Sequence, residues 1–289
     1  MLVLVGTLVV LVCVLGGYVL AHGHLLALWQ PYEVLIIFGG AIGAFLTANS
    51  SKVVKSALRE MLALAKGPNY RKQDYVDLLS LLYDIFAVMR KGGLLGLEKH
   101  IEDPQASPVF SAYPRLMREH YLVEFITDCL RLIIGGNMEP HELEALLDAE
   151  VENHHAEAEA PAQAVAKMAD ALPGFGIVAA VLGIVTTMSN LSGDTSEIGA
   201  HIAGALVGTF LGILLCYGFI GPLAAAMEAR VREDGKAFEC VKVALLASLR
   251  GYNPKVAVEF ARKVLSAHAR PTFLDLEEHL KGERAGAGA

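Results

Sequence analysis

The sequence predicts an all-α membrane protein with four transmembrane helices, and three observations support this prediction. The 289 residues are 54% hydrophobic and only 19% charged, and the mean hydropathy of +0.46 is too high for an ordinary soluble domain. Four segments meet or approach the roughly 20 apolar residues that a helix needs to cross a bilayer. All 24 Lys and Arg residues lie outside these segments, in two blocks at residues 52–167 and 230–284.

The four apolar segments are expected to form the membrane-spanning helices. They occupy residues 2–20, 32–49, 172–191 and 202–223. The first segment has an alternative interpretation as a cleaved signal peptide, since Val19 and Ala21 have the spacing of a cleavage site. The absence of Lys or Arg before it, and its length, favour a retained helix. Trp29 and Tyr32 beside the second segment are typical of an interfacial anchor.

The charge distribution also predicts the orientation of the chain. Lys and Arg collect on the cytoplasmic flanks of membrane helices, so both charged blocks are expected to be cytoplasmic and the protein to lie in a bacterial inner membrane. An even number of spans then places both termini in the cytoplasm. The expected organisation is a first helix pair (1–51), a large cytoplasmic helical domain (52–171), a second helix pair (172–223) and a cytoplasmic C-terminal region of helices with a disordered tail (224–289).

The cytoplasmic segments are expected to be helical throughout. Apolar residues at helical spacing predict a helix over 74–90 that Gly92 and Gly93 break, and a second helix over 119–134 that ends at Gly135 and Gly136. A third begins near Glu139 and is acidic as far as the third span, which is typical of a solvated face. Helices over 227–249, 255–268 and 273–281 follow the fourth span, and residues 282–289 are expected to be disordered.

The membrane segments offer small residues and hydroxyl groups but no charge near their centres. Glycines four residues apart in the fourth span, and small residues in the third, predict close helix packing. The hydroxyl groups belong to Thr186, Thr187, Thr209 and Tyr217. A threonine in a span often only bonds to its own helix backbone. If the protein moves protons, the carboxyl group that carries them must therefore come from a partner helix.

Several other functional classes are disfavoured. The four cysteines are scattered, so neither a disulfide framework nor a metal site is expected. The net charge of −7 argues against nucleic acid as a partner. The spans hold no nucleophile with a base, so an enzyme is not expected, and no cofactor is predicted. His154 and His155 are adjacent, but neighbours on a helix point about 100° apart, so a solvated face is favoured over a metal site.

Seven short stretches and the order of two spans, a large loop and two more spans carry a family resemblance. They are Gln30-Pro31, YVDLLSLLY (75–83), DCLRLIIG (128–135), LPGFGIVAA (172–180), VGTFLGILLCYGFIGP (207–222), AVEF (257–260) and LEEH (276–279). With them the chain resembles the MotA family of bacterial flagellar stator subunits. The resemblance implies a ring of five copies around two MotB chains, which supply a proton-carrying Asp and the anchor to the cell wall. The proton gradient would drive this ring against the rotor protein FliG.

The resemblance also implies roles for individual residues. Arg90 and Glu98 match the loop charges that face FliG, and Pro173 and Pro222 match the prolines that couple proton flow to movement. Thr209 matches a hydroxyl near the partner's Asp. Ala180 stands where sodium-driven relatives have threonine, which favours protons. Thr186 and Tyr217 are further candidates for lining the channel or facing the partner.

Two alternatives remain open at this stage. An ExbB or TolQ type energiser of envelope transport also uses the proton gradient, but it has three spans with its large loop after the first. A membrane scaffold without transport would use the glycines only for packing, and it predicts that Thr209 and Pro173 tolerate substitution.

Overall fold

The computed structural model describes residues 2–64, 67, 69–136, 139–189 and 195–286, and within these ranges the regular structure is entirely helical. The chain divides into two compact units. The first unit comprises Met1–Gly67 and Ala158–Arg230, and the second comprises Pro68–Glu157 and Val231–Ala289. Two long helices, α7 and α9, contribute residues to both units.

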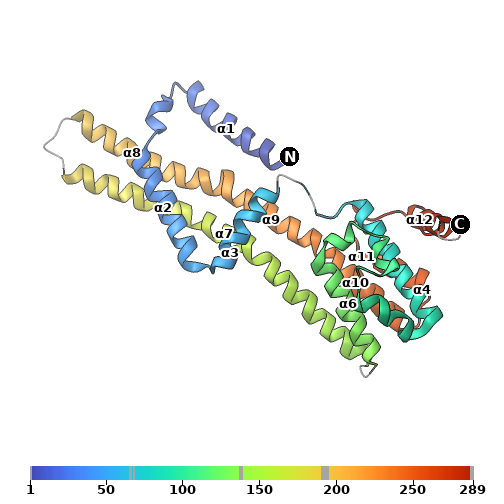
Figure 1. Ribbon diagram of the computed structural model, residues 1–289. Coiled ribbons are helices and arrows are strands. Elements are labelled where there is room, and N and C mark those ends of the chain that lie inside the picture. Colours follow the sequence, from blue (N-terminus) through green and yellow to red (C-terminus); the bar gives the residue numbers. More distant parts are fainter. Residues whose placement is uncertain (1, 65–66, 68, 137–138, 190–194, 287–289) are drawn as a thin grey trace. The chain divides into compact units, whose positions relative to one another are not determined.

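The first unit holds the apolar helices (Figure 1). In chain order its elements are α1 (Leu2–Leu20), the short 3-10 helix η1 (Leu25–Leu28), α2 (Pro31–Ala48), α3 (Ser51–Ala63), most of α7 (Pro140–Ser189), α8 (Thr195–Leu215), η4 (Cys216–Ile220) and the start of α9 (Gly221–Asp234). In the described part of the chain, four helical stretches are long and apolar enough to cross a membrane. They contain the four predicted spans, which confirms the predicted number and places, although residues 190 and 191 of the third lie outside the described residues.

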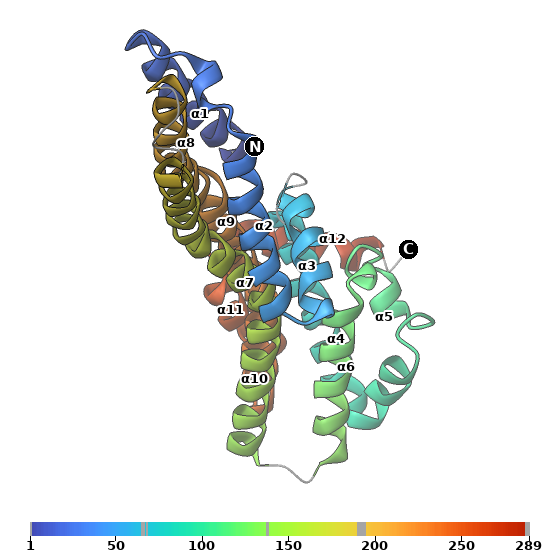
Figure 2. The same ribbon diagram turned by 90° about the vertical axis from the view of Figure 1, so that its left-hand side faces the viewer.

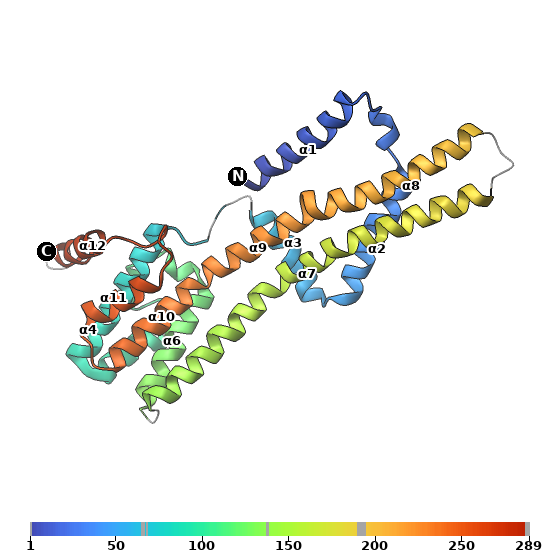
Figure 3. The same cartoon turned by 180° about the vertical axis from the view of Figure 1, so that it is seen from behind.

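Helices α7 and α8 run side by side (Figures 1 and 3), and glycine makes their close approach possible. A Cβ atom added to Gly176 would lie 3.0 Å from the carbonyl oxygen of Gly208 and 3.2 Å from Cα of Gly212. A Cβ atom added to Gly212 would lie only 2.8 Å from the carbonyl oxygen of Leu172. Backbones this close leave no room for a side chain, so the predicted small-residue packing is confirmed.

The second helix of the unit, α2, packs against this pair through small residues as well. Ile37 and Ala41 of α2 are fully buried, and they share a hydrophobic cluster with Ala169, Leu172 and Ala179 of α7. Gly40 lies directly against the ring of Phe175. Figure 2 shows α2 ending at a sharp bend, after which α3 begins. The sequence analysis expected residues 52–171 to be helical throughout but did not give α3 bounds of its own.

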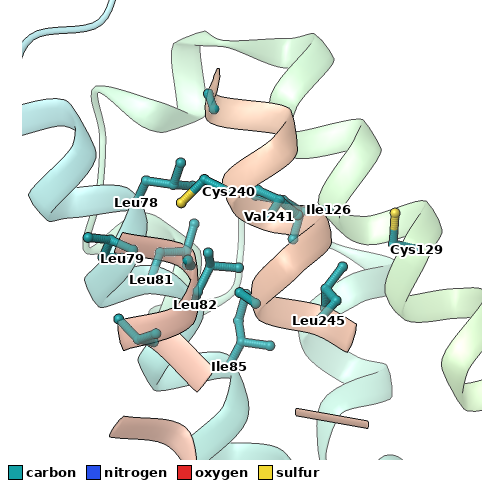
Figure 4. Packing of buried hydrophobic residues seen from close by; sticks show 14 of the residues in the cluster. Leu78, Leu79, Leu81, Leu82, Ile85, Ile126, Cys129, Cys240, Val241 and Leu245 are labelled. Carbon is teal, nitrogen blue, oxygen red and sulfur yellow. The ribbon is translucent and has the colours of Figure 1, made fainter. Parts of the chain in front are cut away.

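The second unit contains α4 (Lys72–Glu102), α5 (Pro108–Ser111), η3 (Leu116–Arg118), α6 (His120–Gly135), the beginning of α7, α10 (Lys236–Leu249), α11 (Pro254–Val264) and α12 (Phe273–Gly286). Side chains of three helices, α4, α6 and α10, form a central part of its core. Figure 4 shows Leu78, Leu82 and Ile85 of α4 packed with Ile126 and Cys129 of α6 and with Cys240, Val241 and Leu245 of α10. All eight are at most 1% exposed.

The predicted helices of this unit are present, with several differences in their extent, one of which is that α11 ends at Val264 and not at residue 268. The break near Gly93 is confirmed by its left-handed φ of 66°, but the chain continues as helix to Glu102. The single helix expected over 227–249 is interrupted at Gly235, between α9 and α10. Helix α12 extends to Gly286, so the tail predicted to be disordered is helical there, and residues 287–289 lie outside the described residues.

Candidate functional site

Arg90 and Glu98 lie on α4, one on each side of the break at Gly93, and both side chains are exposed. Neither forms an ion pair or a hydrogen bond with any residue that the structure describes. Some other charged residues of the same unit are paired. Lys72 Nζ lies 2.6 Å from Asp275 Oδ2, and Arg115 Nε lies 2.7 Å from Asp74 Oδ1. Arg90 and Glu98 are therefore opposite charges that can still form ion pairs with another protein, because no described residue of this chain pairs with them.

The segment after Gly93 is fixed by buried groups. Leu97 and Ile101 are buried, and the ring nitrogen Nδ1 of His100 lies 2.8 Å from Ser107 Oγ. Burial, with a smaller contribution from Lys99, lowers the pKa of His100, so its ring stays neutral at neutral pH. Ser107 Oγ also accepts hydrogen bonds from the first backbone N–H groups of α5. The turn that carries Glu98 is thus held in one position within its unit.

An apolar side chain stands between these charges. Leu95 is 81% exposed, and Leu94 beside it is also exposed. Leu94 and Leu95 form a small exposed apolar patch with Arg90 and Glu98 on either side of it in the sequence, and this patch is a candidate surface for meeting another protein. The sequence analysis did not single out Leu95, because a leucine one residue away from the buried helix stripe gives no signal of its own.

The acidic part of α7 is only partly the solvated face that was predicted. Lys242 of α10 pairs with Asp148, and Arg250 Nη2 lies 2.7 Å from Glu144 Oε2. Burial is the main cause, and Asp128 the second, of the raised pKa of Glu150. These carboxylates attach α7 to its neighbours in the second unit instead of facing only water.

The interpretation of His154 as a solvated residue was wrong. Its ring lies 4.0 Å, centroid to centroid, from Phe238 and 5.4 Å from Tyr121. Burial against these rings is the main cause of its lowered pKa. No three His, Cys, Asp or Glu side chains come close enough to hold a metal ion in the described part of the chain.

In the first unit, Pro173 lies inside α7, which stays helical through it. A Cβ atom on Gly212 of α8 would lie 3.3 Å from Cα of Pro173, so the proline sits at the tight contact between the two helices. Proline has no N–H group for the helix and its ring crowds the preceding turn. The most closely packed point of the helix pair is therefore also a point of weakened helix.

Pro222 is accommodated differently, by a π-helical turn. The segment η4 covers Cys216–Ile220, and the N–H group of Gly221 donates to the carbonyl oxygen of Cys216, five residues back. This wider turn relieves the backbone next to a residue that can neither donate nor fit in a regular α-turn. The sequence predicted a helix boundary or hinge here, but not this turn.

The hydroxyl groups predicted to line a channel are not joined to one another by hydrogen bonds in the described residues. Thr186 Oγ1 donates to the carbonyl oxygen of Leu182 at 2.9 Å, and Thr187 Oγ1 donates to Gly183 at 2.8 Å. Thr186 and Tyr217 are exposed, whereas Thr209 is half-buried. Ala180 is also half-buried. The two threonines of α7 thus form the backbone bonds expected of threonines in an isolated span.

Glu33 is a residue that the sequence analysis overlooked. It lies in the first turn of α2, and its Oε1 is 2.9 Å from the place of a Cβ atom on Gly204 of α8. Its other oxygen, Oε2, is buried and accepts no hydrogen bond in the described structure. The signal was present, because Glu33 is the one charged residue in the predicted span 32–49.

Comparisons with known proteins agree with one another. The family model described as "Motility protein A N-terminal" matches residues 4–93, and the model of the MotA/TolQ/ExbB proton channel family matches residues 118–239. The chain is 49% identical over 284 residues to a protein named "Motility protein A" from Salmonella typhimurium, with 98% of this chain and 96% of that protein covered. It is 43% identical to "Chemotaxis protein LafT" from Vibrio parahaemolyticus, over 95% of this chain and 96% of that one.

Two solved structures have the same fold. "Structure of C. jejuni MotAB" superposes with a TM-score of 0.73 at 20% identity and covers 94% of this chain and 98% of its own. The flagellar MotAB stator complex from Bacillus subtilis gives a TM-score of 0.66 at 25% identity, covering 89% of this chain and 92% of its own.

Proposed function

The chain belongs to the MotA family of flagellar stator subunits, within the MotA/TolQ/ExbB proton channel family, and we propose how its residues couple proton flow to rotation. As a stator subunit it is a multi-pass membrane protein. We further propose that both termini and the segments 52–171 and 224–289 are cytoplasmic, as the Lys and Arg distribution indicates.

We propose that the proton path takes its carboxyl group from a partner, because Glu33, the one carboxylate in the four predicted spans, lies in the first turn of α2 and not near its centre. The titles of the two similar structures describe complexes named MotAB, which supports a MotB chain as that partner. We propose that five copies of this chain surround two MotB spans. Thr209, Ala180, Thr186 and Tyr217 would face or lie near the partner's Asp, with no resident cofactor and the proton gradient as the source of energy.

The observation that carries this proposal is the contact between α7 and α8 at Pro173. The helices approach so closely at Gly212 that a small displacement of one backbone must move the other, because packed interfaces do not deform continuously. Pro173 and the π-turn before Pro222 are two points where the helical hydrogen-bond pattern is weakened, and Pro161 is a further proline inside α7. We propose that protonation of the partner's Asp displaces this pair and that the two prolines permit the movement.

Torque would leave the chain through the exposed turn of α4. Arg90 and Glu98 make no ion pair among the described residues, and they flank the exposed Leu95. Charges of opposite sign favour rapid, reversible contact, since each exposed pair contributes about 1 kcal/mol or less. We propose that this surface meets complementary charges on FliG.

The two alternative functions make different predictions. An ExbB or TolQ type energiser is disfavoured because two of the four membrane-length helices precede the large loop and because the similar full-length proteins are motility proteins. A passive scaffold would tolerate substitution of Thr209 and Pro173.

Expression in motile cells that lack their own stator genes tests the proposal. We expect swimming only when this chain is expressed together with a MotB-type partner, and slower swimming when the proton gradient is collapsed. Protons that enter through the assembled complex should lower the cytoplasmic pH. Proton entry without rotation would support the energiser, and the absence of both would support the scaffold.

A further inference from the structure

Helix α3 has an exposed side that the proposed function does not use. We propose that α3 lies on the cytoplasmic surface of the membrane, with Leu58 and Leu62 inserted among the acyl chains and Lys55 and Arg59 bound to the headgroups of anionic phospholipids.

The fold fixes α3 through one face only. Ala57 is buried, and Met61 and Leu64 pack beside it in a cluster that includes Ala162 and Val165 of α7 and Ala224 and Met227 of α9. All these residues belong to the first unit. The helix is also capped, since Ser50 Oγ accepts the N–H group of Val53 at 3.4 Å. Helix α3 is therefore a positioned element of that unit.

A second apolar stripe on α3 is left uncovered. Leu58 is 58% exposed and Leu62 is 76% exposed. Residues four apart lie one above the other on a helix, so the two leucines form one stripe. At about 100° per residue, this stripe is displaced by roughly a quarter turn or more from the face formed by Ala57 and Met61. Two adjacent exposed leucines need an apolar environment that the described fold does not give them.

Cationic side chains flank the exposed leucines on the side away from the buried face. Lys55 and Arg59 lie one turn apart there, and both are exposed. Arg59 Nη2 is 3.6 Å from Glu60 Oε1, but its side chain remains 77% exposed. Lys52 continues this row toward the start of the helix. The order around α3 is thus a packed face, an apolar stripe and a cationic row, which is the order that a helix in the plane of a bilayer surface requires.

The position of α3 along the chain places it at that surface. It begins at Ser51, three residues after the end of α2 at Ala48, and α2 is one of the four membrane-length helices. A helix that starts so soon after a span must begin near the bilayer boundary. Figure 2 shows α3 turning away from α2 at this point.

The charges favour lipid over protein as the occupant of this stripe. A second copy of the chain is the other candidate cover for Leu58 and Leu62, and the test below distinguishes the two. The cytoplasmic leaflet carries anionic lipids and attracts Lys and Arg near its surface. Long basic side chains also reach headgroups while their stems cover apolar surface. The inference rests on membrane insertion of α2 and on the orientation proposed above, and not on proton flow or torque.

The chain has a single tryptophan, Trp29, which makes a direct test possible. In a Trp29→Phe background, Leu62→Trp places the only tryptophan on the exposed stripe. The full chain is reconstituted in vesicles of phosphatidylcholine and phosphatidylglycerol, with bromine carried by the acyl chains of one lipid or the other. We expect bromine to quench this tryptophan, and to quench it more strongly on phosphatidylglycerol.

Substitution of the cations completes the test. Each cation near the surface strengthens the attraction to an anionic leaflet by roughly fivefold, so Lys55→Gln with Arg59→Gln should remove most of the preference for phosphatidylglycerol. The matched control is Leu274→Trp in the same background, since Leu274 is an equally exposed leucine of α12, at 66%. Acrylamide, and not brominated lipid, should quench the tryptophan at position 274. Leu58→Trp repeats the measurement if Leu62→Trp does not fold.

Three results would overturn the proposal. Quenching of the tryptophan at position 62 by acrylamide alone would show that the stripe faces water. Protection from both quenchers would show that another protein surface, such as a second copy, covers it. Equal quenching by the two brominated lipids, unchanged by the Lys55 and Arg59 substitutions, would show insertion without binding of anionic headgroups. Each result is independent of whether the chain drives rotation.

Discussion

The two units of the molecule are packed by opposite means. In the second unit, helices are held together by large side chains such as Leu82 and Ile85, which fill the space between α4, α6 and α10. In the first unit, α7 and α8 are held together by the absence of side chains at Gly176 and Gly212. In the second unit, the hydrophobic effect in water drives large apolar side chains together. In the first unit, lipid surrounds the helices and provides no hydrophobic effect between them, so close backbone packing holds them together. Damage should therefore come from removing atoms in the second unit and from adding them in the first.

The largest effect is expected from adding one methyl group at the closest backbone contact between α7 and α8. In Gly212→Ala the new Cβ would meet the carbonyl oxygen of Leu172 at 2.8 Å, so α7 and α8 must separate. Swimming should be abolished, and less assembled complex should be recovered from membranes. Gly174→Ala is the control, because a Cβ atom there meets nothing within 4 Å. Equal behaviour of the two variants would contradict the packing argument.

Removing buried atoms from the second unit should have a smaller but measurable effect. Leu82→Ala removes buried atoms from the core and should lower the free energy of unfolding by about 2–5 kcal/mol. The loss is measured as a lower melting temperature of the purified protein. Leu95→Ala, at a site that is 81% exposed, should change stability by no more than about 0.5 kcal/mol. A similar shift for both variants would show that burial does not set stability in this unit.

Leu95 differs from Leu82 because it lies outside the hydrophobic core. Leu95→Asp should leave stability unchanged but reduce motor torque, because a carboxylate would occupy the centre of the surface between Arg90 and Glu98. Torque is measured on tethered cells, with the amount of chain in membranes as the control. Full torque in this variant would exclude Leu95 from the contact with the rotor.

The smallest expected effect is a dependence of stability on pH in the second unit. Burial against Phe238 lowers the pKa of His154, with His155 acting in the same direction and Glu157 opposing it. The unfolded chain therefore binds this proton more readily than the folded one, so stability is full above the ordinary histidine pKa of about 6.5 and decreases as the pH falls below it. In His154→Phe the loss of melting temperature between about pH 7.5 and pH 5.5 should be smaller than in the wild type. A larger loss of melting temperature in the variant than in the wild type would show that the pKa of His154 is not lowered by folding.

Much of the fold could be predicted from the sequence because the strongest signals are apolar. The four spans, and the helices now seen as α4, α6 and α11, follow from length and periodicity. Among the stretches that carry the resemblance, residues 75–83 of α4 are mostly core residues, including Tyr75, Leu79 and Leu82, whereas most residues of 207–222 are only partly buried or exposed.

What could not be predicted depends on contacts between segments. Helix α3 starts just after a span and is rich in cations, so its sequence indicates only a cytoplasmic flank of that span. Its packing against α7 is seen only in the structure. The π-turn before Pro222 has the composition of the helix around it. His154 was misjudged because Phe238, the ring that covers it, is far away in the sequence. The roles of Arg90, Glu98, Pro173, Pro222 and Thr209 stay predictions from the resemblance.

The central claim is that this chain transmits force to a rotor through charges that its own fold leaves unpaired. The most direct measurement is the torque of tethered cells that carry Arg90→Glu, alone and together with an acid-to-base change at the facing position of the rotor protein. The account predicts loss of torque in the single variant at normal membrane levels of the chain, and recovery in the double variant. Full torque in Arg90→Glu alone would contradict it.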